Sequence, residues 1–140
     1  IDDTQEWMDM YIDRILSVLN EEPIDIFVNP TLLPVQIRDR YDELWTEERM
    51  NKVISALVEN NVVLEINDRY QIPSLEFLRR AKEAGATFSF GTNNTGANYD
   101  NLDYCLRMYQ ELDLSAGDLF IPRPDGEKAI QVKGHLLGGN

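Results

Sequence analysis

Apolar and polar positions follow two different periods along this chain. Apolar residues that recur three and four positions apart predict amphipathic helices near residues 4–20, 46–59, 74–84 and 100–113. Short apolar runs bounded by turn residues predict strands near residues 24–29, 62–67 and 86–91. Because strand and helix alternate, we expect an α/β fold in which the strands are parallel and the helices pack on one side of them.

Local signals define the ends of several predicted elements. Asp3 and Thr46 precede helical patterns as N-caps, Ser74 begins the third predicted helix, and Asp100 is expected to cap the fourth. Residues 31–45 are predicted to form a long irregular loop after the first strand. Loops of this length in a small domain are often functional, so this segment is a candidate part of a site.

The alternation of side chains along each strand predicts which residues share a face. Apolar even positions are expected to lie under the helices, and they are Ile24, Ile26, Val28, Val62, Leu64, Ile66, Phe88 and Phe90. The odd positions become polar toward the strand ends, at Asn29, Glu65, Asn67 and Asn93. Sites in parallel α/β folds lie at the carboxyl ends of strands, so we expect Asn29, Asn67 and Asn93 to line one pocket.

Three segments carry a family resemblance: LEIN at 64–67, AKEAG at 81–85 and FSFGTNNT at 88–95. They resemble the C-terminal half of a PHP domain, from the polymerase and histidinol phosphatase family of metal-dependent phosphoesterases. The resemblance extends over residues 24–122. It implies parallel βα units that form part of a distorted TIM-like (βα)7 barrel, with residues 1–122 as the C-terminal half of that barrel and residues 123–140 as a tail.

The resemblance also implies an altered metal site. The last family motif, Gly-Ser/Thr-Asp-x-His, is replaced by Gly91-Thr92-Asn93-Asn94-Thr95, and an upstream His-Pro resembles Asn29-Pro30. The chain has one histidine, His135 in a glycine-rich stretch, and one cysteine, Cys105 in a helical pattern. Zinc sites use His, Cys or carboxylate ligands, so we expect no metal ligands and no cofactor from this half. A divalent metal would need ligands from the missing N-terminal half.

Several polar residues are candidates for chemistry. Glu65, together with Asp42, is a candidate base or anchor, although Glu65 could equally be a structural carboxylate that ties down a loop. Arg38, Arg40 and Arg69 are candidate anion ligands, and the alternative is that they pair with nearby acids such as Asp39, Asp42 or Glu43. Candidate contacts for a polar ligand are Asn29, Asn67, Asn93 and Asn94.

Three functions remain open at this point. The resemblance implies a divergent hydrolase of the phosphoesterase superfamily with a lost or remodelled metal site. The alternatives are a non-catalytic pseudoenzyme that binds a small polar or phosphorylated molecule, and a purely structural subunit. A three-stranded parallel sheet leaves two unpaired edges, so a further partner would be the N-terminal half of the domain or a second chain.

The composition of the chain limits the classes of partner that it can bind. The chain has 140 residues, 43% hydrophobic residues and a net charge of −12, which fits one globular domain. Such acidity repels polyanions, so we expect no nucleic-acid partner. No apolar run approaches the roughly 20 residues of a membrane span, so we expect no membrane partner. We predict a cytoplasmic protein, with export left open because the chain begins at Ile1.

Overall fold

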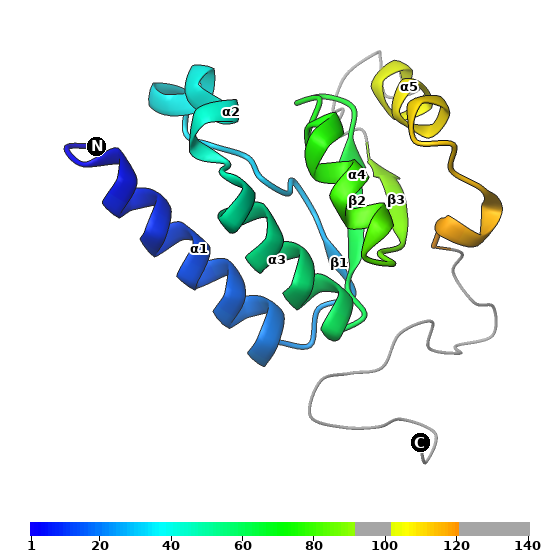
Figure 1. Ribbon diagram of the computed structural model, residues 1–140, viewed down its shortest axis with the longest axis horizontal. Helices are drawn as coiled ribbons and strands as arrows, with labels where there is room; N and C mark the ends of the chain where they lie inside the picture. Colours follow the sequence, from blue (N-terminus) through cyan, green and yellow to red (C-terminus); the bar gives the residue numbers. More distant parts are fainter. Residues whose placement is uncertain (92–101, 121–140) are drawn as a thin grey trace.

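A three-stranded parallel sheet forms the centre of the computed structural model, which describes residues 1–91 and 102–120 (Figure 1). The strands are β1 (Ile26–Phe27), β2 (Val63–Asn67) and β3 (Phe88–Gly91), in the order β1-β2-β3. Phe27 pairs with Leu64 and Leu64 with Phe88, and both pairings are parallel. The predicted α/β class and the parallel direction of the strands are confirmed.

The helices of the described residues alternate with the strands. They are α1 (Thr4–Glu21), α2 (Tyr41–Leu44), α3 (Glu47–Glu59), α4 (Leu75–Glu83) and α5 (Asp103–Glu111), with the short 3-10 helices η1 (Val35–Arg40) and η2 (Ala116–Asp118). The predicted N-caps Asp3 and Thr46 are present, and Ser74 caps α4 in the same way, because each side chain accepts a hydrogen bond from the backbone N–H three residues later. Such caps satisfy N–H groups that the first turn leaves unpaired.

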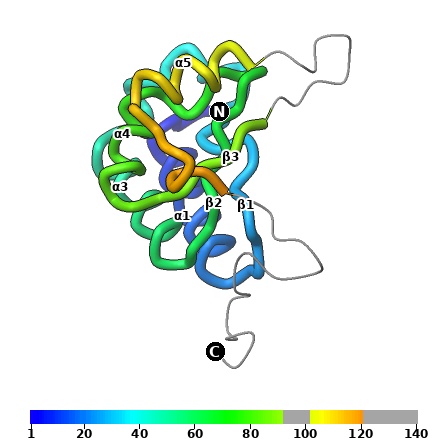
Figure 2. The backbone as a smooth tube through the Cα atoms, turned by 90° about the vertical axis from the view of Figure 1, so that its right-hand side faces the viewer, coloured from blue at the N-terminus to red at the C-terminus, as the bar shows by residue number. Residues whose placement is uncertain are grey.

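The helices pack against one face of the sheet, as predicted. Figures 1 and 2 show α1, α3 and α4 on the same side of the strands. Leu64 and Phe88 on this face are fully buried in one core with Leu57 of α3 and Phe77 of α4. Burying each side chain of this size contributes about 1.5–3 kcal/mol. On α5, the ring of Tyr109 lies 6.4 Å from the ring of Phe90.

The prediction for the first strand was wrong in length and in orientation. β1 contains only Ile26 and Phe27, and its register places Phe27, not Ile26, beside Leu64 on the helix-covered face. A one-residue change of register turns every side chain of a strand to the opposite face. Val28, expected under the helices, is 56% exposed. The pattern of this segment indicated the opposite face, because its even positions are all apolar whereas the odd positions on either side of Phe27 are Asp25 and Asn29.

The segment after β1 is folded rather than irregular, which corrects the prediction of a long loop. It contains η1 and α2, and it begins with left-handed backbone at Asn29 (φ 48°) and Thr31 (φ 65°). A β-branched residue rarely adopts a positive φ. Thr31 is held there by buried contacts, because the Trp45 indole N–H donates to its carbonyl at 3.1 Å and the Tyr41 hydroxyl donates to its Oγ1 at 2.7 Å.

The C-terminal part of the described chain extends the sheet. After η2, Leu119 forms an isolated parallel bridge with Phe88, and the Phe120 N–H donates to the Phe88 carbonyl at 2.8 Å. The helix predicted from residue 100 begins at Asp103, with Leu102 as its N-cap. Asp100, and the tail with His135, lie outside the described residues.

Candidate functional site at the strand ends

The Glu65 carboxylate lies at the carboxyl ends of β1 and β2. Its Oε1 accepts hydrogen bonds from the backbone N–H of Asn29 at 3.0 Å and from Nδ2 of Asn67 at 2.9 Å. Glu65 is 7% exposed. A buried carboxylate is stable only when hydrogen bonds or a cation replace its water, and the two donors on Oε1 meet part of this need. Glu65 therefore joins the end of β2 to the turn that follows β1.

Asn67 connects the Glu65 carboxylate to the next loop. Its side chain is fully buried, and Nδ2 also donates to Oδ1 of Asn29 at 3.1 Å. Its Oδ1 accepts from the backbone N–H of Tyr70 at 2.9 Å. The Asn67 backbone pairs with Ile72, so the intervening residues form a tight loop. Asn67 thus fixes the position of this β2–α4 loop relative to the strand ends.

A hollow at the same end of the sheet, here called the strand-end cleft, has a volume of about 310 Å³. It lies between the segment that follows β1 and the β2–α4 loop. It is lined by Leu32, Leu33, Arg38, Tyr41, Asp42, Tyr70, Gln71, Ile72 and Ser74. Pockets for small ligands begin at roughly this size, about 300 Å³.

Arg38 lines the strand-end cleft. The guanidinium carbon lies 5.4 Å from the centroid of the Tyr70 ring, and Nε donates to the Leu33 carbonyl at 3.0 Å. Among the described residues, no protein atom accepts a hydrogen bond from the two terminal nitrogens. The guanidinium of Arg69 lies 5.4 Å from the same ring. A cation from η1 and a cation from the β2–α4 loop therefore meet at one aromatic side chain.

Tyr41 forms part of the wall of the strand-end cleft. Its hydroxyl donates to Thr31 Oγ1 and accepts from the backbone N–H of Ser74 at 3.1 Å. Burial raises the pKa of this phenol, and the negative charge of Asp42 adds to the effect. Tyr41 is therefore a neutral phenol near pH 7, and it ties the turn at Thr31 to the start of α4.

The structure places the predicted site residues in two groups, because Asn29, Glu65 and Asn67 do not line the strand-end cleft. Asn29, Glu65 and Asn67 form one hydrogen-bonded cluster. Arg38 and Asp42 line the strand-end cleft, and Arg69 reaches its rim through Tyr70. Tyr41 and Tyr70 were not among the site residues predicted from the sequence. The available signal for Tyr70 was an aromatic residue next to Arg69 in the loop after the second strand.

Arg40 does not join this site. Its Nε donates to Glu43 Oε2 at 3.0 Å, and Nη1 donates to the hydroxyl of Thr4 at 3.2 Å. The hydrogen bond with Glu43 raises the pKa of Arg40 and lowers that of Glu43. The alternative of pairing with a nearby acid is therefore the one observed for Arg40. The predicted positions Asn93 and Asn94 lie outside the described residues.

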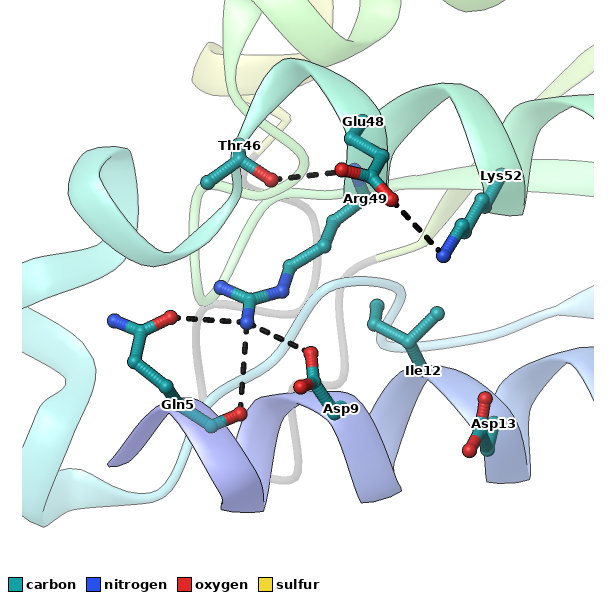
Figure 3. Close-up of a pocket in the computed structure, with 8 residues that line it drawn as sticks. All are labelled: Gln5, Asp9, Ile12, Asp13, Thr46, Glu48, Arg49 and Lys52. Atoms are coloured by element: carbon teal, nitrogen blue, oxygen red, sulfur yellow. Dashed lines mark hydrogen bonds and ion pairs between the residues drawn. The ribbon is translucent and has the colours of Figure 1, made fainter. Parts of the chain in front are cut away.

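A second hollow, of about 420 Å³, lies between α1 and α3 (Figure 3). Both of its cations are already paired with polar or acidic side chains, whereas Asp13 has no hydrogen bond or ion pair among the described residues. Arg49, which is 9% exposed, donates to Gln5 Oε1 and to Asp9 Oδ1, each at 2.9 Å. Lys52 pairs with Glu48 at 3.2 Å. This hollow is therefore a polar contact between two helices, and among its described lining residues no cation is left unpaired as Arg38 is.

The described residues contain no group of three or more His, Cys, Asp or Glu side chains placed to hold a metal ion. Within residues 1–91 and 102–120, no helix combines the length and the apolar character needed to cross a membrane. Comparisons with family models, curated proteins and solved structures found no match for this chain. The resemblance to the PHP family therefore stays a prediction.

Proposed function

We propose that this chain is a ligand-binding domain of PHP-like βα-barrel type that holds a small phosphorylated or otherwise anionic molecule in the strand-end cleft. The observation that carries the proposal is Arg38, which lines the cleft and whose terminal nitrogens have no hydrogen-bond partner among the described residues. A guanidinium matches phosphate and carboxylate groups through paired N–H donors.

The order of the strands supports the barrel part of the proposal. The strands are arranged β1-β2-β3, and the Leu119 bridge adds to β3 in the same direction. The helices pack on one face, whereas a doubly wound sheet has helices on both faces. Strands that follow one another in sequence order, with a polar face at Glu65 and Asn67 opposite the helices, are typical of part of a βα barrel. In this proposal the remaining strands come from the N-terminal half or a second chain.

The local charge supports anion binding. The chain has a net charge of −12, so an anion is repelled by most of its surface. At the rim of the strand-end cleft, however, Arg38 and Arg69 both approach the ring of Tyr70. A local pair of guanidiniums can concentrate one small anion there, although a polyanion would still meet the acidic surface.

Binding of propyl phosphate, measured by calorimetry at low ionic strength, tests the proposal. We expect Arg38→Ala to weaken binding by about tenfold or more, because a hydrogen bond to a charged group contributes about 1.5–3 kcal/mol. Arg79→Ala is the matched control, since Arg79 is an exposed arginine of α4 that pairs with Glu76. Equal losses in both variants, or no binding by the wild type, would contradict the proposal.

Hydrolysis is the second candidate function, and the position of Glu65 favours it. This carboxylate lies beside Gly91, the residue that begins the segment resembling the metal motif of the family. Oε1 of Glu65, however, accepts hydrogen bonds from two donors of the protein, and this fits a structural anchor better than a general base. The test measures hydrolysis of p-nitrophenyl phosphate with Mn²⁺ or Zn²⁺ in the wild type, in Glu65→Gln, and in Asn93→Asp with Thr95→His.

Metal-dependent turnover by the wild type that Glu65→Gln abolishes, with stability and propyl phosphate affinity retained, would establish the hydrolase. Turnover or tight metal binding only after Asn93→Asp with Thr95→His would identify a remodelled metal centre in a binding domain.

A further inference from the structure

The strand-end cleft carries two opposite charges that do not neutralise each other. Arg38 and Asp42 both line it, yet they form no ion pair with each other, and neither pairs with another of the described residues. Asp42 also accepts no hydrogen bond within the described part of the chain. Two other charged residues of the same segment, Arg40 and Glu43, do pair with each other.

The polar groups of this lining differ, because the Tyr70 hydroxyl and the Gln71 side-chain amide form no hydrogen bond within the described part of the chain. The Tyr41 hydroxyl is occupied by Thr31 and by the N–H of Ser74. Leu32, Leu33 and Ile72 contribute apolar surface to the same lining. The groups that remain open to a ligand therefore include one cation and one anion on a partly apolar wall.

This arrangement discriminates between classes of small molecule. A simple anion gains from Arg38 but is repelled by Asp42, and a simple cation gains from Asp42 but is repelled by Arg38 and Arg69. A molecule with both charges gains at each end. Charges placed in this way add selectivity as well as affinity, because the wrong partner meets a repulsive group.

We propose that the ligand of the strand-end cleft is a small zwitterion, with a phosphate or carboxylate bound by Arg38 and an ammonium group bound by Asp42. This inference rests on the proposed anion-binding function and names the class of its ligand. Arg38 binds the anionic end of the ligand. Asp42 determines the specificity for a zwitterion over a simple anion.

Matched probes test the inference on the full chain by calorimetry. They are ω-aminoalkyl phosphates with two, three or four carbons, propyl phosphate as the anion alone, and propylamine as the cation alone. We expect at least one aminoalkyl phosphate to bind about tenfold more tightly than propyl phosphate, which is about 1.4 kcal/mol. Asp42→Asn should reduce this preference to about twofold while propyl phosphate binds as well as, or better than, it does to the wild type.

Asp39→Asn is the control for net charge, because Asp39 is exposed on η1 and does not line the strand-end cleft. This variant should keep the full preference for the zwitterion. ω-Aminocarboxylates of the same lengths show whether phosphate or carboxylate is the preferred anionic end.

The outcomes separate the two proposals. Binding of propyl phosphate and of the aminoalkyl phosphates with equal affinity would overturn the zwitterion while the anion site stands. The zwitterion is likewise overturned if Asp42→Asn and Asp39→Asn reduce the preference equally. No binding of any phosphate or carboxylate probe would overturn both proposals.

Discussion

The carboxylate of Glu65 lies directly against the backbone of Gly91. A Cβ placed on Gly91 would come 2.1 Å from Oε2 of Glu65 and 2.4 Å from its carboxyl carbon. The two residues belong to neighbouring strands, where Glu65 pairs with Ser89 and Asn67 with Gly91. The carboxylate therefore occupies space that exists because position 91 has no side chain. Glycine is required at this position because the Glu65 carboxylate approaches its backbone so closely.

Gly91→Ala should displace the Glu65 side chain and destabilise the fold. Overpacking of a filled site costs about 1–3 kcal/mol, and the free energy of unfolding in urea should fall by this amount. Gly117→Ala is the control, because a Cβ there would meet only Ser115 Oγ at 3.7 Å. A loss in Gly91→Ala no larger than in Gly117→Ala would show that Glu65 moves aside without cost.

Asn67→Asp should make stability strongly dependent on pH. The new carboxyl would be fully buried beside Glu65, so burial and like charge would raise its folded-state pKa above the unfolded value of about 4. The folded state would then hold the proton more tightly. Stability relative to wild type should therefore be greatest below pH 4 and should fall as the pH rises toward neutrality.

The measurement for this variant is urea unfolding at several pH values between 3 and 7. Asn51→Asp is the control, because Asn51 is exposed on α3. A difference from wild type that stays constant with pH in Asn67→Asp would contradict the prediction.

Tyr41→Phe should loosen the turn that follows β1. The change removes the hydroxyl that donates to Thr31 Oγ1 and accepts from the N–H of Ser74. Leaving buried polar groups unsatisfied costs about 1–3 kcal/mol, which should appear in the free energy of unfolding. Tyr109→Phe is the control, since the Tyr109 hydroxyl forms no hydrogen bond within the described part of the chain. Equal stabilities of the two variants would show that the hydroxyl of Tyr41 is not needed to hold Thr31.

Stability should decline at alkaline pH, because buried groups must ionise on unfolding. Burial raises the pKa of Cys105 from 9.0 to about 12, and Asp68 adds to the effect. Burial likewise raises the pKa of Tyr11 to about 12. The folded state keeps these protons longer than the unfolded state, so the contribution is fully present below pH 9 and is lost as the pH rises toward 12.

Cys105→Ser separates the contribution of the thiol. Serine keeps a donor for the Ile66 carbonyl, which the Cys105 thiol reaches at 3.1 Å, but it does not ionise in this range. We expect the variant to lose less stability than wild type between pH 9 and 11, measured by urea unfolding. Parallel curves for the two proteins would contradict this assignment.

Helix ends were predictable because their causes are local. Asp3, Thr46 and Ser74 each bind a backbone N–H only three residues away, so the sequence around each cap contains the whole interaction. The parallel direction of the strands was predictable for a similar reason. A helix between two strands returns the chain to the same end of the sheet.

The orientation of β1 and the turn at Thr31 were not predictable from local patterns. Phe27 faces the helices because β1 pairs with β2, whose residues lie far along the chain. Thr31 adopts a left-handed conformation because Tyr41 and Trp45 hold it. Such contacts override the preference of a β-branched residue for extended backbone, and no short window of sequence contains them.

The sequence by itself determined which chemistry is present: carboxylate and amide groups at the strand ends, and arginines in the segment that follows β1. The tertiary structure decided their roles. Arg38 and Arg40 lie two residues apart in η1, and a 3-10 helix with three residues per turn directs them to different sides. Arg40 meets Glu43 on its own segment, whereas Arg38 meets Tyr70 from the β2–α4 loop and lines the strand-end cleft. The difference arises because packing of the chain places Tyr70 beside one arginine and not beside the other.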